Sequence, residues 1–321
     1  MSTARGSQLE LMLIEEATWG SVPATPAGYI IPVSGVSGDW YRRNLIDNPE
    51  LRGNRNPAAP VRGNVSVQGS FQAPLKLNAV GWLLKHGIGD ASTSGTAAPY
   101  THTFKVGFSD GSAGDMETGL TIEHGYTDIG QYHYFTGCRV NSLGFTGSSE
   151  GVAIVDVGVI GQDFNQDTDS LDASPTTYTD TAIDHFAATI DEGGSSSAIV
   201  TDVTLTLSNN LDPQYVIGSA GQIGDLPEGG ATVNGSLTAL FQNDTLLGKG
   251  RNHTESELTL TWTSGSYSLA LHVPELVYEP SSPAVSGPGG VKITMNFRGY
   301  YANDADATAL KATLINTVAD Y

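Results

Sequence analysis

The tetrapeptide Val67-Gln68-Gly69-Ser70 recurs 166 positions later as Val233-Asn234-Gly235-Ser236. The segments around the two tetrapeptides, residues 61–86 and 227–250, therefore form two copies of one structural unit. Alternation of apolar and polar residues in both tetrapeptides is typical of β-strands. A chain that repeats a long β-rich unit once is characteristic of a symmetric assembly or of a two-domain binding protein.

A second match follows at the shorter offset of 138 positions. Leu120-Thr121-Ile122 corresponds to Leu258-Thr259-Leu260. The next alternating segment keeps this offset, because Val155, Val157, Val159 and Gly161 correspond to Ile293, Met295, Phe297 and Gly299. The fall in offset from 166 to 138 predicts 28 additional residues in the first copy, between His86 and Leu120.

Composition favours strands and excludes several classes of function. Only 15% of the 321 residues are charged, whereas glycine occurs 39 times, and such a composition favours strands and turns. The chain carries 34 acidic and 15 basic residues, a net charge of −19, which repels nucleic-acid phosphates. The single Cys138 excludes an intrachain disulfide. Without a signal peptide or an apolar membrane span, we expect a protein that is not inserted into a membrane.

Periodicity predicts a mainly β protein with one short helix in each copy. The first helix is expected at residues 78–87, with Asn78 as its N-cap and Gly87 as its stop, and Asp244 occupies the Asn78 position of the second copy. Strands are predicted at residues 30–40, 61–71, 120–124, 132–145, 152–161, 186–190, 203–208, 258–263, 267–273 and 291–300.

The predicted domain organisation follows from the repeat. Residues 1–30 form an N-terminal arm, and residues 31–162 form the first domain, with the insertion within residues 87–119. A polar linker at residues 163–184 precedes the second domain, residues 185–321. At the end of that domain Leu310, Leu314 and Ile315 are expected to form an amphipathic turn or a C-terminal arm.

No residue pattern predicts catalysis, a cofactor or a metal site. The seven histidines lack metal-ligand spacing, and no Gly-x-Ser-x-Gly nucleophile motif occurs. Residues 163–169 place oxygen ligands at positions 1, 3, 5 and 7 of a calcium loop, but Thr168 and Ser174 replace the required glycine and glutamate. We therefore interpret this run as a solvated linker and the protein as a non-enzyme.

Several short motifs, taken in order, resemble the tail tube proteins of tailed bacteriophages. The resemblance spans nearly the whole chain and is closest to siphophage-like major tail tube proteins with a duplicated tube domain. Its motifs are Gly6-Ser7-Gln8, Glu15-Glu16-Ala17-Thr18-Trp19-Gly20, Val67-Gln68-Gly69-Ser70 before a helix, Leu205-Thr206-Leu207-Ser208-Asn209-Asn210-Leu211 leading to Ile217-Gly218, Phe297-Arg298-Gly299-Tyr300, and the terminus from Asn316 to Tyr321.

The resemblance implies a β-sandwich or barrel with one flanking helix in each copy. It also implies stacked rings that form a hollow tube in the virion tail, assembled in the host cytoplasm, through which the genome leaves. The implied partners are other copies of the chain, the tape measure and terminator proteins of the tail, and DNA that passes without specific binding. Because two domains per chain fill two places in a ring, three chains would form a pseudo-hexameric trimer.

The segment of residues 44–62 is predicted to be a long irregular loop, and loops of such length tend to be functional. It lies where a tube subunit extends toward the adjacent ring. Positive charge is concentrated in and beside this loop, which leads us to predict contacts with acidic surface on that ring. The residues concerned are Arg42, Arg43, Arg52, Arg55 and Arg62.

A second interpretation remains open from the sequence. A tail-tip or surface carbohydrate-binding β-sandwich would bind sugars through exposed aromatic side chains. The candidates for such contacts are Trp40, Tyr41, Tyr132, Tyr134, Tyr300 and Tyr301.

Overall fold

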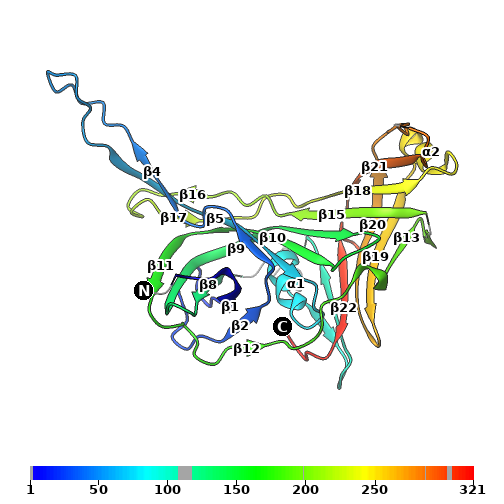
Figure 1. Cartoon of the computed structure of the whole chain (residues 1–321), viewed down its shortest axis with the longest axis horizontal. Coiled ribbons are helices and arrows are strands. Elements are labelled where there is room, and N and C mark those ends of the chain that lie inside the picture. The colour runs from blue at the N-terminus through cyan, green and yellow to red at the C-terminus, as the bar shows by residue number, and fades with distance from the viewer. Residues whose placement is uncertain (1–2, 108–117, 198, 286, 302–305) are drawn as a thin grey trace.

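The computed structural model describes residues 3–107, 118–197, 199–285, 287–301 and 306–321. The chain is mainly β, and its described part contains two α-helices, α1 (Val80–Ile88) and α2 (Thr245–Asn252). Two 3-10 turns, Gly6–Gln8 and His185–Ala187, precede strands. The molecule is elongated, and one β-hairpin projects from its left end in Figure 1.

The strands cover every segment for which the sequence predicted one. In chain order they are β1 (Leu9–Glu15), β2 (Gly28–Ile31), β3 (Gly35–Ser37), β4 (Arg42–Ile46), β5 (Val61–Pro74), β6 (Ser92–Ser94), β7 (Tyr100–Lys105), β8 (Leu120–Tyr126), β9 (Gln131–Gly147), β10 (Ile154–Gly161), β11 (Asp163–Asp167), β12 (Thr176–Thr177), β13 (Ala188–Glu192), β14 (Ser195–Ser196), β15 (Val200–Ser208), β16 (Gln214–Tyr215), β17 (Ile223–Asp225), β18 (Thr232–Leu240), β19 (Ser256–Ser264), β20 (Tyr267–Tyr278), β21 (Lys292–Gly299) and β22 (Lys311–Asn316).

One antiparallel sheet runs through the whole chain. Its strand order is β3-β5-β10-β9-β15-β18-β21-β20. The first four strands come from the first predicted copy and the last four from the second. Strands β9 and β15 join the two groups, with Gly147 opposite Val203 and Ser142 opposite Ser208.

Each half adds a second sheet. In the first half β12, β2, β1, β8, β9 and β11 pair in that order, and in the second half β14, β13, β19, β20, β22, β7 and β6 do so. Strands β9 and β20 belong to both sheets of their halves because they bend. The bend lies near Gly137, which has a φ of 62°, in β9 and near Pro274 in β20. The fold is therefore a sandwich in each half, and the sheets do not close into a barrel.

The apolar positions that match at the offset of 138 form the core. Val155, Val157 and Val159 are at most 3% exposed, and Ile293, Met295 and Phe297 in the second half are at most 2% exposed. Burying one such side chain contributes about 1.5–3 kcal/mol. The alternation that marks the repeat is thus the alternation between core and surface.

A glutamate ties the helix to the sheet in both halves. Glu15 at the end of β1 lies 2.8 Å from Lys85 of α1, and Glu192 at the end of β13 lies 2.7 Å from Lys249 of α2. Burial alone would raise the pKa of Glu15, but hydrogen bonds and charges from His86 and Lys85 lower it to about 2. The same ion pair therefore fixes the helix in both halves.

The helix caps differ from the prediction. The N-cap of α1 is Ala79, and the Asn78 side chain instead accepts hydrogen bonds from the backbone and hydroxyl of Thr317. Tyr321 covers the helix start as well, with its hydroxyl 2.8 Å from the Asn78 carbonyl. The C-terminal residues thus bind Asn78, and its side chain accepts their hydrogen bonds instead of capping the helix. Asp244 is the N-cap of α2, but its side chain makes no capping bond.

Two terminal segments that were predicted as arms contain core strands. Strand β1 buries four consecutive apolar residues, Leu11 to Ile14, between β2 and β8, so both of its faces are covered. Strand β22 lies between β20 and β7 and buries Ala312 and Leu314. Sequence reasoning missed them because their partner strands are far away along the chain.

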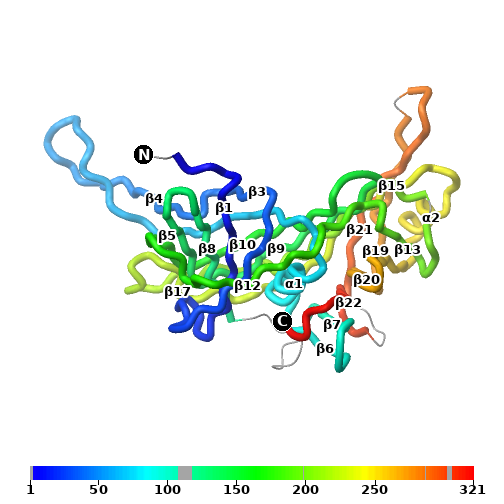
Figure 2. Tube along the Cα trace, turned by 60° about the horizontal axis from the view of Figure 1, so that its bottom comes forward, coloured from blue at the N-terminus to red at the C-terminus, as the bar shows by residue number. Residues whose placement is uncertain are grey.

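The predicted linker and insertion are also built into sheets. Residues 163–167 pair with β9 as β11, so the candidate calcium loop is an extended strand. Farther along, Ser170 and Leu171 donate hydrogen bonds to the buried Glu123. The insertion supplies β6 and β7, and β7 extends the sheet of the second half (Figure 2). The domain boundaries themselves remain a prediction.

We expect Leu205→Ala to lower the free energy of unfolding by about 2–5 kcal/mol. Leu205 is 1% exposed and lies between β9 and β18, so truncation leaves a cavity at the junction of the halves. Urea denaturation would measure the loss. Thr206→Ala, on the half-exposed face of the same strand, is the control, and equal effects of the two substitutions would contradict the assignment of the core face.

Candidate functional site

The predicted irregular loop is confirmed for residues 47–60, while its two ends belong to the strands of a projecting hairpin. Strand β4 pairs with β5, with Arg42 opposite Ser66 and Ile46 opposite Val61, and residues 47–60 connect the two strands. The hairpin extends beyond the sandwich at the left of Figure 1. At the base of the hairpin β4 pairs with β5, because the alternating side chains of β5 continue to its first residue, Val61.

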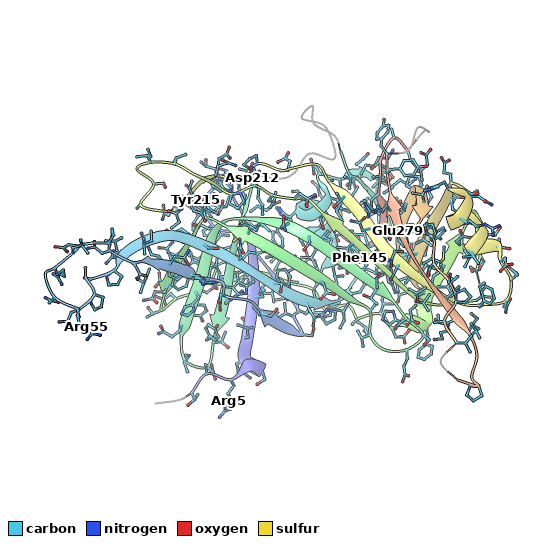
Figure 3. All side chains as sticks on the ribbon, turned by 90° about the horizontal axis from the view of Figure 1, so that it is seen from above. Arg5, Arg55, Phe145, Asp212, Tyr215 and Glu279 are labelled. Carbon is cyan, nitrogen blue, oxygen red and sulfur yellow. The ribbon has the colours of Figure 1, made fainter. Side chains whose placement is uncertain are left out.

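The structure brings all five predicted arginines together on this hairpin but gives them different contacts. Arg43 is used within the subunit, because it donates hydrogen bonds to the Gly63 carbonyl (3.0 Å) and the Ala220 carbonyl (2.7 Å). Arg52 lies 3.7 Å from Glu50, both about half exposed, so this ion pair contributes little. The side chains of Arg42, Arg55 and Arg62 are exposed, and Figure 3 shows Arg55 near the end of the hairpin.

The hairpin also exposes large apolar side chains, which sequence reasoning missed. Leu45 is 73% exposed, Ile46 52%, Val61 49% and Leu51 98%. A two-stranded ribbon is marginally stable by itself, and clustered apolar side chains on a surface mark interaction sites. The signal in the sequence was Leu45-Ile46 among charged residues. The hairpin therefore has the chemistry of a surface that packs against another protein.

A second hairpin, β16–β17, lies along the base of the first. The Tyr215 hydroxyl donates to the Val65 carbonyl at 2.9 Å, and the Val65 amide donates to the Gly221 carbonyl at 2.7 Å. Its connecting residues Val216 and Ile217 are 56% and 107% exposed. Figure 3 places Tyr215 and Arg55 at the same end of the molecule. The two hairpins together make this end rich in exposed apolar groups.

An aromatic cleft of about 640 Å³ lies beside β3, and we call it the Trp40 cleft. The ring of Trp40 is 4.4 Å from that of His124 and 5.0 Å from that of Phe135. Trp40 Nε1 and His124 Nε2 are buried and have no hydrogen-bond partner in the structure. Leaving such groups unpaired is unfavourable by about 1–3 kcal/mol each. The residues lining the cleft include Val36, Gly38, Tyr41 and Phe164.

Burial and one neighbouring charge set the protonation state of His124. Burial, and to a smaller extent the charge of His133 on β9, lower the pKa of His124 to about 4. The imidazole is therefore neutral at neutral pH, as suits an aromatic cluster. Trp40 is only 8% exposed, so it is not the exposed sugar platform that the carbohydrate-binding interpretation required.

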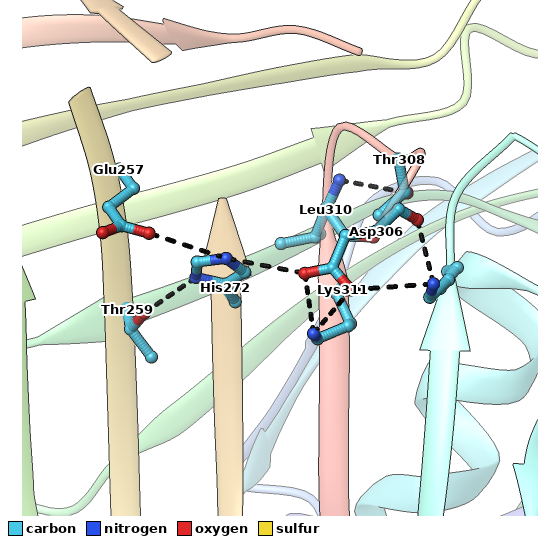
Figure 4. Close-up of polar contacts among 8 residues, drawn as sticks. Glu257, Thr259, His272, Asp306, Thr308, Leu310 and Lys311 are labelled. Carbon is cyan, nitrogen blue, oxygen red and sulfur yellow. Dashed lines mark hydrogen bonds and ion pairs between the residues drawn. The ribbon is translucent and has the colours of Figure 1, made fainter. Parts of the chain in front are cut away.

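A charged network joins four strands of the second sheet in the second half, β19, β20, β22 and β7 (Figure 4). Asp306 lies 2.7 Å from Lys311 of β22 and 3.7 Å from Lys105 of β7. His272 of β20 lies 3.7 Å from Asp306 and 4.0 Å from Glu257 of β19. Burial raises the pKa of Asp306, but Lys311 and the other cations lower it overall. The network holds β7 against β22, and the Thr259 hydroxyl lies 2.8 Å from His272 Nδ1 beside it.

No group of three or more His, Cys, Asp or Glu side chains within the described ranges could hold a metal ion. Within the same ranges no helix is long and apolar enough to cross a membrane. Cys138 is fully buried, which raises its pKa well above the usual value, and an inert thiol results. The surfaces of the protein, rather than a pocket chemistry, are its functional candidates.

Comparison with known protein families gives a match. A family model described as phage tail tube protein matches residues 6–299. The chain belongs to this family. No curated protein matches the chain.

Membership makes this tail tube protein a structural component of the phage tail, and hence of the virion. The match spans both predicted copies and includes the projecting hairpin and the Trp40 cleft. The five arginines lie within the matched residues as well, but no comparison assigns a role to them.

We expect the stability of the tail tube protein to fall between pH 6.5 and about 4. In this range His124 of the unfolded chain takes up a proton whereas the folded one stays neutral, so unfolding is favoured by up to about 3 kcal/mol. Thermal unfolding as a function of pH would show the loss. His124→Gln should flatten the pH dependence, and an unchanged slope in this variant would contradict the assignment.

Proposed function

We propose that the protein polymerises into stacked rings that form the phage tail tube, the conduit for genome ejection into the host. The observation that carries the proposal is the family match over residues 6–299. The exposed apolar hairpins and the unpaired outer edge of β3 support it, because both need a neighbouring chain. A neighbour can pair an open sheet edge by adding its own strand.

Three chains per ring follow from the repeat. Each half supplies four strands to the continuous sheet, so one chain occupies two equivalent places in a ring. A ring of six places then contains three copies and is pseudo-hexameric. Closed rings built from one repeated contact are the usual form of such assemblies.

The charge of the chain suits a conduit. A net charge of −19 disfavours retention of DNA phosphates, so DNA passes without specific binding. Assembly in the host cytoplasm, with tape measure and terminator proteins as further partners, belongs to the same proposal. No membrane insertion is part of it.

The β4–β5 hairpin is proposed to contact, through its arginines, acidic surface on a neighbouring copy. Sequence reasoning placed that copy in the adjacent ring. The exposed Arg52 and Arg55 at the far part of the hairpin are the candidates for direct pairing, whereas Arg43 is engaged within the subunit.

Negative-stain electron microscopy of the concentrated protein tests the proposed function. We expect hollow tubes whose cross-section averages show threefold symmetry. True sixfold symmetry would contradict the trimer. Monodisperse single chains that bind glycans would overturn the tube function and support the carbohydrate-binding alternative.

Charge reversal tests the arginines. We expect Arg52→Glu combined with Arg55→Glu to prevent tube growth without a change in melting temperature, because both side chains are exposed. Light scattering would follow growth, and microscopy would tell free rings from single chains. Arg251→Glu, another exposed cation, on α2, is the control. Normal tubes from the double variant would exclude the proposed arginine contact.

A further inference from the structure

The joint between the two halves, formed by β9 and β15, completes a hydrophobic core. Gly147 lies opposite Val203 and Phe145 opposite Leu205 in this joint. All four residues are buried, and the Phe145 ring lies 6.4 Å from that of Trp262. A strand of the first half thus closes the sandwich of the second half.

The strands around the joint have counterparts in the other half. Strands β3, β5, β10 and β9 have the neighbour order of β15, β18, β21 and β20. A side-chain hydrogen bond between Ser37 and Ser70 (2.8 Å) recurs between Thr204 and Ser236 (2.9 Å). Strand β3 therefore corresponds to β15 at an offset of 167, while β9 corresponds to β20 at the offset of 138.

Only the inner ends of the two four-strand groups are joined within the chain. Strand β3 pairs with β5 on one side, and among the described residues no strand pairs with its other edge. At the opposite end, residues 280–285 follow β20 in the place that the end of β9 occupies in the first half. Ala284 forms a bridge to Lys292, so this segment still runs beside β21. Its Val285 is 74% exposed.

The two offsets assign a partner to each open end. Val285 corresponds to Gly147, and Val36 corresponds to Val203. When the internal joint is repeated between two copies, Val285 of one copy therefore lies opposite Val36 of the other. In the same way Pro283, which corresponds to Phe145, comes to lie opposite Gly38, which has no side chain to obstruct it.

The Trp40 cleft is the space that the internal joint fills in the second half. By strand register Tyr126, which lines the cleft, corresponds to Trp262, because Tyr126 pairs with Gln131 as Trp262 pairs with Leu269. Phe145 packs beside Trp262. In the first half no described residue takes the place of Phe145, and the cavity of about 640 Å³ remains. Pro283 of another copy is apolar and compact enough to pack there on the Trp40 ring.

The unpaired polar groups of the cleft also suit this segment. Trp40 Nε1 donates hydrogen bonds only, and it finds no acceptor within the chain. Residues 280–285 carry the hydroxyls of Ser281 and Ser282 together with their backbone carbonyls. A second copy of the chain therefore brings both the apolar group and the acceptors that the cleft lacks.

The connection that follows the joint supplies a second, independent correspondence. Between β15 and β18 the chain runs back across the first half, where Gln162 Nε2 donates to the Ile223 carbonyl (2.9 Å) and Arg139 Nη1 to the Leu226 carbonyl (2.8 Å). The corresponding connection of the first half, between β3 and β5, contains the β4–β5 hairpin. It projects away from the molecule (Figure 1).

The surface on which that hairpin would lie is open. Tyr300 corresponds to Gln162 and lines a cleft of about 470 Å³ together with Ala231, Arg298 and Tyr301. The charges of the two surfaces are also complementary. Arg42 corresponds to Asn209, and Glu279 corresponds to Asn141. Since the Asn209 amide donates to the Asn141 carbonyl (2.8 Å), the repeated joint brings Arg42 beside Glu279.

We propose that the second half of one copy binds the first half of the next copy in the geometry of the β9–β15 joint. Residues 280–285 of one copy cover the Trp40 cleft of the next, whose β4–β5 hairpin covers the cleft beside Tyr300. The inference rests on the proposed ring assembly and adds to it the surfaces that meet. It also places the hairpin on a neighbour within the ring rather than on the adjacent ring.

A disulfide across the joint tests the geometry. A Cβ on Gly147 would lie 2.8 Å from Val203 Cγ1, so the corresponding positions 285 and 36 are within disulfide reach. Oxidised tubes of the Val36→Cys, Val285→Cys variant should give covalent two-copy and three-copy species on non-reducing gels. Val36→Cys, Val152→Cys is the matched control, because Val152 is exposed but follows the internal joint, and it should remain single-chain.

The outcomes separate this interface from the proposed function. Tubes whose chains link only in the Val36, Val285 variant support the joint. Intact tubes without links overturn the joint and leave the tube function standing. If the wild-type protein forms no rings or tubes, both fail.

A single substitution gives an independent test. Pro283→Asp places a carboxylate at the Trp40 cleft of the next copy, and we expect at least a tenfold rise in the concentration needed for assembly. The melting temperature of the single chain should not change, because Pro283 is not buried. Pro288→Asp, an exposed position outside residues 280–285, should assemble normally. Equal assembly of the two variants would exclude the proposed contact.

Discussion

The pairing of β9 with β15 is the interaction on which the rest of the structure depends. A sheet edge carries unpaired backbone amides and carbonyls, and it is stable only when paired, covered or charged. By pairing these two edges the chain joins eight strands into one sheet and closes the core around Trp262. Every other feature of the molecule lies on one side or the other of this joint.

A joint between two similar halves has a geometric consequence. The contact is heterologous, because the end of one unit meets the beginning of the next. Such a contact leaves one open end of each kind, and repetition closes a ring or continues as a filament. The Trp40 cleft and the projecting hairpin form one open end of this chain, and residues 280–285 with the cleft beside Tyr300 form the other. Their aromatic and apolar character follows from the core they would complete.

The two halves also differ in ways that fit different tasks. The first half carries His124 where the second has Leu260, and it donates β7 to the sheet of the second half. Asp306, Lys105 and Lys311 hold that donated strand in place. These ion pairs span elements from both halves and keep them in one arrangement. A rigid subunit of this kind suits a tube wall, in which each ring must match the next.

The sequence by itself determined the repeat, the core positions and most of the strands, because side-chain alternation along a strand is local and survives in the printed order of residues. It also indicated the family and the arginine-rich segment. It did not reveal that Leu9–Glu15 and Lys311–Asn316 are core strands, since one of the two partner strands of each lies more than 100 residues away. Nor did it reveal that Asn78 binds Thr317 instead of capping its helix. Only the tertiary structure decided which edges are paired and which remain open, because an edge is defined by its neighbours in space.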